Sequence, residues 1–176
     1  MTIVDALDTL WIMDLKDEFK RGADWVHNSL DFNKNQFISA FETTIRSLGG
    51  LLSAYDLSGD KRLLVKATDL GNRLMPIFNT ATGLTHSQIN LATGQTMNTG
   101  WTGGYALIAE FGTLQLEFRR LTQLTGDQKY DNAVTRIMDW LKSKSPYDGL
   151  FPAFIQPETG AFGPDHITFG AWGDSF

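Results

Sequence analysis

A carboxylate and a guanidinium stand four residues apart at Glu42 and Arg46, and two glycines follow at Gly49 and Gly50. Apolar residues recur around this pair at spacings of three and four, as on the buried face of an amphipathic helix; they are Phe41, Ile45, Leu48, Leu52 and Tyr55. The pattern predicts that both glycines lie on the same side of the helix as Glu42 and Arg46, in one row along it. Because glycine costs about 1 kcal/mol relative to alanine inside a helix, we expect a ligand or another helix to come close there. The spacing alone fits a surface ion pair or the wall of a site.

Two more carboxylates, Glu110 and Glu117, line a second predicted helix together with Thr113. This polar row runs beside an apolar stripe formed by Leu107, Phe111, Leu114 and Phe118. A solvated helix face is the ordinary interpretation of such a row. The alternative is that both acids point from one helix face into a shared site.

Three aspartates have two interpretations each. Asp174 lies within the glycine-bearing, aromatic-flanked residues 172–176, where it fits a helix N-cap and a catalytic carboxylate equally well. Asp5 and Asp8 interrupt an otherwise apolar run, and buried acids need partners to offset their desolvation. We expect these two to cap helix ends or to orient a site.

The composition is that of an ordinary globular protein, with 176 residues, 42% hydrophobic and 20% charged. A net charge of −5 with scattered Lys and Arg argues against nucleic acid as a partner. The chain has no cysteine, so these residues provide neither a disulfide framework nor a cysteine metal site. It also has no 18-residue apolar run and no signal peptide, so a targeting segment would lie outside this chain.

Familiar cofactor and metal motifs do not occur in this sequence. The histidines, His27, His86 and His166, are far apart and lack metal-ligand spacing, so we interpret them as structural or surface residues. The sequence contains no P-loop, dinucleotide fingerprint, nucleophile elbow or EF-hand loop. The carboxylates therefore remain the main candidates for chemistry.

Helical periodicity predicts an all-α protein with helices at residues 3–14, 17–30, 37–56, 61–77, 103–124 and 128–143. Two similar Gly-Asp turns, at residues 57–60 and 124–127, are 67 residues apart, and each joins two helices. Such αα-hairpins, when repeated, indicate a helical solenoid or a closed toroid.

Two stretches depart from the helical pattern. Residues 83–104 lose periodicity, which is long for a connection and often functional, and Trp101 is their aromatic member. Residues 150–155 and 167–169 predict a small β-hairpin around a turn at 157–160.

A carboxylate-rich helical scaffold with aromatic side chains suits sugars, because glycosidic cleavage requires positioned carboxyl groups. Its motifs resemble those of the class I α-1,2-mannosidases, glycoside hydrolase family 47, which trim mannose from N-linked glycans. The resemblance covers the chain in order, through VDALDTLWIM (4–13), FETTIRSLGGLLSAYDLSGD (41–60), GNRLMP (71–76), AEFGTLQLEF (109–118), LTGD (124–127), DGL (148–150) and FGAWGDSF (169–176).

The resemblance implies an (α/α)7 toroid, of which residues 1–176 would be an incomplete part, truncated at the C-terminal side and also at the N-terminal side. It implies that Glu42 is the acid that protonates the leaving oxygen through a water, and that Asp174 is a second catalytic carboxylate. Arg46 and Glu110 would bind the sugar. Trp172 occupies a substrate-binding position where relatives differ and where the side chain influences which mannose branch is preferred.

The resemblance also implies parts that this chain lacks. The family inverts the anomeric centre, and its favoured base and the protein ligand of its Ca2+ lie C-terminal to Phe176, so these residues would provide no metal ligand. We therefore expect little or no activity from the chain alone. Asp14 stands where members usually have glycine. The expected substrates are oligomannose N-glycans, and the expected location is the secretory pathway (ER or Golgi) or outside the cell.

Two other interpretations remain open at this stage. The first is a family relative that captures mannose-bearing glycoproteins for degradation with little hydrolysis; the base and the calcium ligand would discriminate it from the enzyme. The second is an unrelated αα-hairpin scaffold for protein interaction, which would leave the Glu42, Arg46, Gly49 and Gly50 row unexplained.

Overall fold

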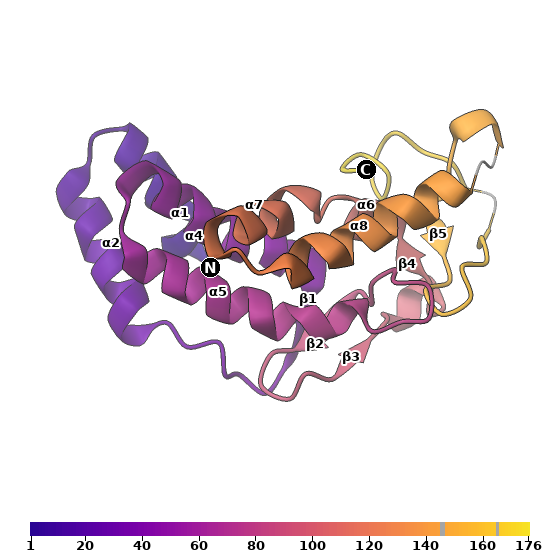
Figure 1. Cartoon of the computed structure of the whole chain (residues 1–176), viewed down its shortest axis with the longest axis horizontal. Helices are drawn as coiled ribbons and strands as arrows, with labels where there is room; N and C mark the ends of the chain where they lie inside the picture. The colour runs from indigo at the N-terminus through magenta and orange to yellow at the C-terminus, as the bar shows by residue number, and fades with distance from the viewer. Residues whose placement is uncertain (145–146, 165) are drawn as a thin grey trace.

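The structure, a computed structural model, describes residues 1–144, 147–164 and 166–176. Figure 1 shows α1 and α2 at one end of the molecule, α5 and the α7–α8 pair along its length, and short strands at the side and the other end. The described helices are α1 (Thr2–Ile12), α2 (Lys16–Ser29), α3 (Ala40–Glu42), the π-helix η1 (Thr43–Leu48), α4 (Gly49–Ser58), α5 (Lys61–Leu74), η2 (Met75–Phe78), η3 (Gly100–Thr102), α6 (Ile108–Gly112), α7 (Gln115–Thr125), α8 (Gln128–Ser143) and η4 (Tyr147–Gly149). None of them is long and apolar enough to cross a membrane.

Four of the predicted helices are confirmed within a few residues: α1, α2, α5 with its 3-10 extension η2, and α8. Their apolar stripes meet in one core, which excludes water from large side chains of several helices. The largest fully buried side chains are Tyr130, Phe111, Phe118, Leu7, Leu48, Leu51, Leu63, Leu70, Leu74, Ile77, Leu84 and Ile89.

Both Gly-Asp turns build the predicted αα-hairpins, α4 with α5 and α7 with α8. Gly59 and Gly126 end the first helix of each pair in the left-handed region, with φ of 71° and 76°. Asp60 and Asp127 then cap the second helix, accepting hydrogen bonds from the backbone N–H groups two residues on at 3.0 and 3.1 Å. The sequence repeat is therefore a repeat of structure.

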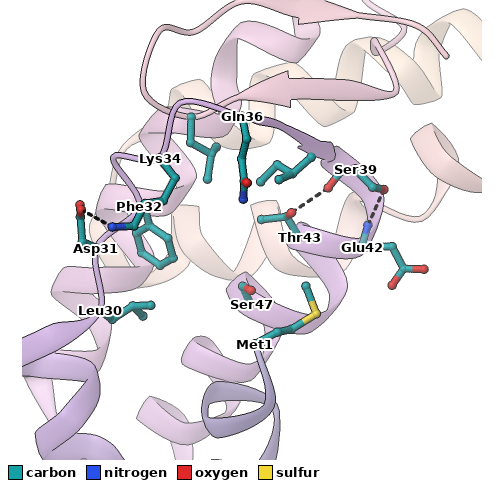
Figure 2. A pocket seen from close by; sticks show the side chains of 12 residues that line it. Met1, Leu30, Asp31, Phe32, Lys34, Gln36, Ser39, Glu42, Thr43 and Ser47 are labelled. Atoms are coloured by element: carbon teal, nitrogen blue, oxygen red, sulfur yellow. Dashed lines mark hydrogen bonds and ion pairs between the residues drawn. The ribbon is translucent and has the colours of Figure 1, made fainter.

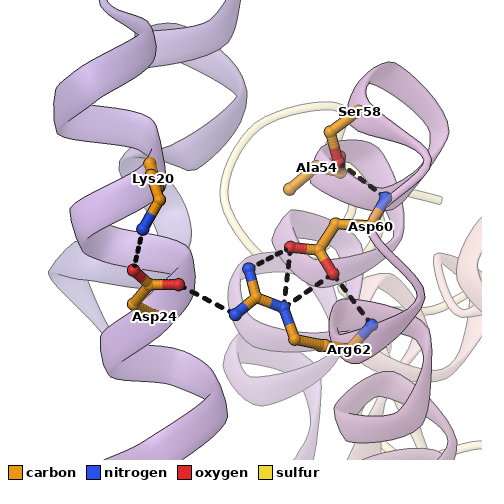
Figure 3. A network of polar contacts seen from close by, with 6 residues as sticks. All are labelled: Lys20, Asp24, Ala54, Ser58, Asp60 and Arg62. Carbon is orange, nitrogen blue, oxygen red and sulfur yellow. Dashed lines mark hydrogen bonds and ion pairs between the residues drawn. The ribbon is translucent and has the colours of Figure 1, made fainter.

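A polar network joins α2 to the first of these turns (Figure 3). Arg62 donates to both carboxylate oxygens of Asp60 and, at 2.8 Å, to Asp24 on α2. These bonds from Arg62 hold the pKa of Asp60 below its ordinary value. Lys20, also on α2, lies 2.6 Å from the other oxygen of Asp24, so Asp24 is held in place where it accepts from Arg62 of the hairpin.

The predicted helix at 37–56 is wrong in its first part and irregular in its middle. Strand β1 (Phe37–Ser39) pairs antiparallel with β2 (Gln88–Asn90), and the Ser39 hydroxyl caps the following helix by accepting from the Glu42 N–H at 3.1 Å. The chain then passes through η1 before α4 begins. Pairing with a distant strand thus overrides local helical periodicity here.

The predicted helix at 103–124 is also wrong at its start and broken within. Gly103 and Gly104 have φ of 64° and 87°, which an α-helix does not accept, and β4 (Ala106–Leu107) pairs with β5 (Phe154–Ile155). Gly112 ends α6, and α7 begins at Gln115. Glycine has the lowest helix propensity after proline, which favours the break there.

The two non-helical predictions are partly corrected. Residues 83–104 carry β2 and β3 (Thr96–Met97), which form a three-stranded sheet with β1 rather than an irregular connection. The predicted turn at 157–160 is confirmed, since the Gly160 N–H donates to the Gln156 carbonyl at 2.7 Å. Residues 167–169 form no strand; the chain returns earlier, through the bridge between Ile155 and Phe162, and β5 pairs with β4.

Candidate active site

Glu42 and Arg46 form a close ion pair, with Arg46 Nε 2.6 Å from Glu42 Oε2. The Glu42 side chain is 42% exposed and the Arg46 side chain is 45% exposed. The hydrogen bond that Arg46 donates to Glu42 is the main cause that raises the pKa of the Arg46 guanidinium. The pair is therefore ordered and solvent-accessible, as a group that meets a polar ligand must be.

The pair sits where α3 passes into the π-helix η1. Two buried threonines stabilise this turn: Thr43 Oγ1 donates to the Ser39 carbonyl at 2.7 Å and Thr44 Oγ1 donates to the Ala40 carbonyl at 2.8 Å. Single π-turns inside helices occur frequently at functional sites. The sequence pattern missed this turn because helical spacing does not distinguish it from α-helix.

The two glycines face close neighbours, as expected from the sequence. A Cβ on Gly50 would lie 3.0 Å from the Val4 carbonyl oxygen, so α1 crosses α4 at that point. A Cβ on Gly49 would lie 3.5 Å from a carboxylate oxygen of Glu117. At both glycines, the close approach is therefore between α4 and another helix, α1 at Gly50 and α7 at Gly49.

Glu110 and Glu117 are half-buried, so the solvated interpretation of their row is wrong. Burial, with a smaller contribution from the charge of Glu42, raises the pKa of Glu110 to about 7. Burial likewise raises the pKa of Glu117, whose Oε2 atom is enclosed without a hydrogen-bond partner among the described residues. α3 contacts α6, so the two elements that carry Glu42 and Glu110 lie side by side.

Asp5 and Asp8 connect α1 to the same region. Asp5 Oδ2 lies 3.8 Å from Arg46 Nη1, and Asp8 Oδ2 accepts from the Ser53 hydroxyl of α4 at 2.9 Å. The interpretation that these acids orient a site agrees with both contacts. The sequence pointed to these acids but not to their partners, which come from residues about 40 positions away.

The segment that carries Trp172 and Asp174 folds over α6. The Ala109 N–H donates to the Trp172 carbonyl at 3.2 Å, and the Phe176 ring fills the space that a Cβ on Gly112 would occupy. Asp174 is exposed, and its Oδ1 accepts from the Ser175 N–H at 3.0 Å. No hydrogen bond or ion pair joins Asp174 to Glu42, Arg46 or Glu110 in the part of the chain that the structure describes.

A cavity of about 410 Å³ adjoins Glu42 (Figure 2). The loop between α2 and β1 forms one wall and the start of η1 forms the other, with Phe32 and Ile38 among its apolar residues and Gln36, Thr43 and Ser47 among its polar ones. In Figure 2 the Glu42 carboxylate points away from this cavity. This cavity was not predicted from the sequence, because the loop that forms its wall has no recognisable motif.

Among the residues that the structure describes, the histidines and the acids do not assemble into a metal site. Across residues 1–144, 147–164 and 166–176, no group of three or more His, Asp or Glu side chains could hold an ion. His27 is on the surface, and His86 Nε2 lies 3.4 Å from Glu158 Oε1. The donor set described for this chain therefore does not fit calcium.

The repeated αα-hairpins, α4 with α5 and α7 with α8, define the class of protein as an α-helical hairpin domain, and Glu42, Arg46 and Glu110 lie on neighbouring elements of it. The model of glycosyl hydrolase family 47 matches residues 1–176, and the chain belongs to that family. The fold agrees: an α-1,2-mannosidase from Trichoderma reesei superposes with a TM-score of 0.87 and 30% identity, over 99% of this chain and 39% of that one. This confirms the (α/α)7 fold and the family expected from the sequence.

Curated relatives are more similar in sequence. A mannosyl-oligosaccharide 1,2-alpha-mannosidase of Arabidopsis thaliana is 50% identical over 99% of this chain and 31% of its own length. An endoplasmic reticulum mannosyl-oligosaccharide 1,2-alpha-mannosidase of Rattus norvegicus is 48% identical over 100% of this chain and 27% of its own length. The chain thus spans about a third of these relatives or less.

Proposed function

We propose that this chain is part of a larger catalytic domain that hydrolyses terminal α-1,2-linked mannose of oligomannose N-glycans. The observation that carries the proposal is the ordered Glu42 and Arg46 pair beside the half-buried Glu110, in a chain that the family model matches from end to end. The names of the relatives support the linkage and the substrate class.

In the proposed reaction, Glu42 passes a proton through a water to the glycosidic oxygen, while Arg46 holds its carboxylate at 2.6 Å. Because its pKa is about 7, the Glu110 carboxyl group is neutral in roughly half of the molecules at neutral pH. In that form it can donate a hydrogen bond to a sugar hydroxyl and accept another. Asp174 supplies a second catalytic carboxylate.

The reaction would invert the anomeric centre. An inverting glycosidase separates its acid and base by about 6.5–9.5 Å, which leaves room for the attacking water. We propose that this base lies outside these residues, and that the calcium ion of the family is also held there, since the described acids and histidines form no ligand cluster. No step here depends on that ion.

The proposal extends to the cellular location. Relatives from Rattus norvegicus and Homo sapiens carry the endoplasmic reticulum in their names. We propose that the protein acts on glycoproteins in the secretory pathway, where N-glycans are trimmed.

The test is mannose release from Man-α-1,2-Man, followed by NMR so that the anomer formed first is observed. A complete family 47 domain that contains these residues should release β-mannose first, and the 176-residue chain alone should release little or none. Binding of the disaccharide without cleavage by the complete domain would instead indicate the glycan-capturing relative. First release of α-mannose would contradict inversion, and release by the chain alone would contradict its inactivity.

A further inference from the structure

The cavity of about 410 Å³ between the α2–β1 loop and η1 has no part in the proposed reaction. The Glu42 carboxylate points away from it (Figure 2), so it is separate from the proposed sugar site. Cavities of about 300–1,000 Å³ that are mostly apolar and carry a few polar groups are typical of small-molecule sites in proteins. This cavity has such a volume and such a lining.

The loop that forms one wall of the cavity is held in place by hydrogen bonds to two other elements. Lys66 of α5 donates to the Leu30 carbonyl at the start of the loop. Asn35, near its end, accepts from the side chain of Asn90 on β2 at 2.7 Å. The wall is therefore ordered before a ligand arrives, and little conformational freedom would be lost on binding.

Most of the lining of the cavity is apolar. Phe32 and Leu91 are each 8% exposed, and Leu30 and Ile38 add to the same surface. A pyranose ring would lose the water on most of its hydroxyl groups here without gaining hydrogen bonds in return. An apolar body fits better, because leaving water is favourable for it.

Two polar side chains of the cavity have no hydrogen-bond partner in the described part of the chain. The Gln36 amide points into the cavity (Figure 2), and the buried Ser47 lines it from η1. Thr43 Oγ1 already donates its proton to the Ser39 carbonyl, so it can offer only a lone pair. Together these groups can bond one oxygen atom of a ligand as donors and as acceptors.

The charges of the loop wall do not favour an ionic ligand. Asp31 Oδ2 lies 3.2 Å from Lys34 Nζ, so the negative and the positive side chain of this loop pair with each other. An ion entering the cavity would lose its hydration without meeting an unpaired opposite charge on the loop. The lining therefore favours an uncharged ligand.

We propose that this cavity is a second ligand site, which binds an uncharged molecule with an apolar body and one hydroxyl or carbonyl oxygen. Gln36 and Ser47 bond the oxygen, and Phe32, Ile38 and Leu91 enclose the apolar body. The inference does not rest on the proposed function, because it uses neither the Glu42 carboxylate nor Arg46.

The test is a titration of the 176-residue chain with 3-phenylpropan-1-ol, followed through the methyl signals of Ile38 and Leu91 in NMR. The comparison ligands are 3-phenylpropanoate, which is charged, and methyl α-mannoside, which is rich in hydroxyls. Ser47→Ala removes one polar group, and Ile38→Phe fills part of the cavity. The matched controls, Ser29→Ala on α2 and Ile12→Phe on α1, make the same changes outside it. Circular dichroism confirms that each variant is folded.

The alcohol should shift both methyl signals of the wild type. Ser47→Ala should weaken its binding by about two- to tenfold, the range for loss of one hydrogen bond. Ile38→Phe should weaken it further, because the added ring takes up space that the ligand needs, and the two controls should bind as the wild type does. Neither the carboxylate nor the mannoside should shift these signals at the same concentrations.

Three results would overturn the proposal. The first is the absence of shifts in the wild type at the solubility limit of the alcohol. The second is binding that Ser47→Ala leaves unchanged, because the hydroxyl of this side chain would then not hold the ligand; this comparison decides even if Ile38→Phe does not fold. The third is an equal response to the carboxylate or the mannoside, which would contradict the assigned class of ligand.

Discussion

Replacing Glu110 with glutamine should remove a specific pH dependence from the stability of the fold. Burial raises the pKa of this carboxyl group from an ordinary 4.5 to about 7. The folded chain therefore binds its proton more tightly than the unfolded chain does. As pH rises through the window from 4.5 to 7, the unfolded state loses the proton first, so the free energy of unfolding falls.

The size of this fall follows from the gap between the two pKa values. At about 1.36 kcal/mol per pKa unit, a gap from 4.5 to about 7 corresponds to a ceiling of about 3 kcal/mol. Glu110 keeps part of its solvent exposure, and solvent screens such effects, so we expect about 1–2 kcal/mol. Glutamine keeps the shape of the side chain and carries no titratable proton.

The assay is urea denaturation of the wild type and Glu110→Gln at several pH values between 4 and 8.5. Between the lower and the upper end of this range, the free energy of unfolding of the variant should rise by about 1–2 kcal/mol relative to that of the wild type. The control, Glu18→Gln, alters an exposed carboxylate on α2 that pairs with Arg21. Its free energy of unfolding should stay within about 0.5 kcal/mol of the wild-type value at every pH. Parallel curves for the wild type and Glu110→Gln would refute the burial argument.

Two glycine substitutions give further tests. Gly50→Ala should destabilise the chain by about 1–3 kcal/mol in urea, because its Cβ would stand 3.0 Å from a backbone oxygen of α1. Gly49→Ala should be neutral or stabilise by up to about 1 kcal/mol, because its Cβ would make ordinary contact with Glu117; the reverse order would show that α1 does not cross at Gly50. Gly173→Ala should displace the Trp172 turn, since its Cβ would clash with the Thr168 carbonyl oxygen, and an unchanged Trp172 indole NMR signal would contradict this.

The long helices and the hairpin turns could be predicted because their signals are local. The glycine and aspartate of each turn carry the cap geometry by themselves, and the apolar spacing of α5 and α8 is regular. The short strands could be predicted only in part: β5 lies within the predicted strand at residues 150–155, but β1 and β4 depend on partners far along the chain. Ala106 pairs with Ile155, and Phe37 pairs with Asn90.

The candidate site was predictable in its residues and less so in its environment. The spacing of Glu42 and Arg46 was enough to expect their ion pair, since residues four apart on a helix are neighbours. The burial of Glu110 was not predictable, because it depends on how α6 is covered by the C-terminal segment that carries Trp172. A row of acids beside an apolar stripe has the same sequence whether water or protein covers it.

The most direct test of the proposed function is the turnover of Glu42→Gln in a complete family 47 domain that carries these residues. With Man-α-1,2-Man as substrate, loss of the general acid should lower kcat by about 100- to 10,000-fold, while KM changes little. A kcat equal to that of the wild type would remove Glu42 from the mechanism and contradict the site proposed here.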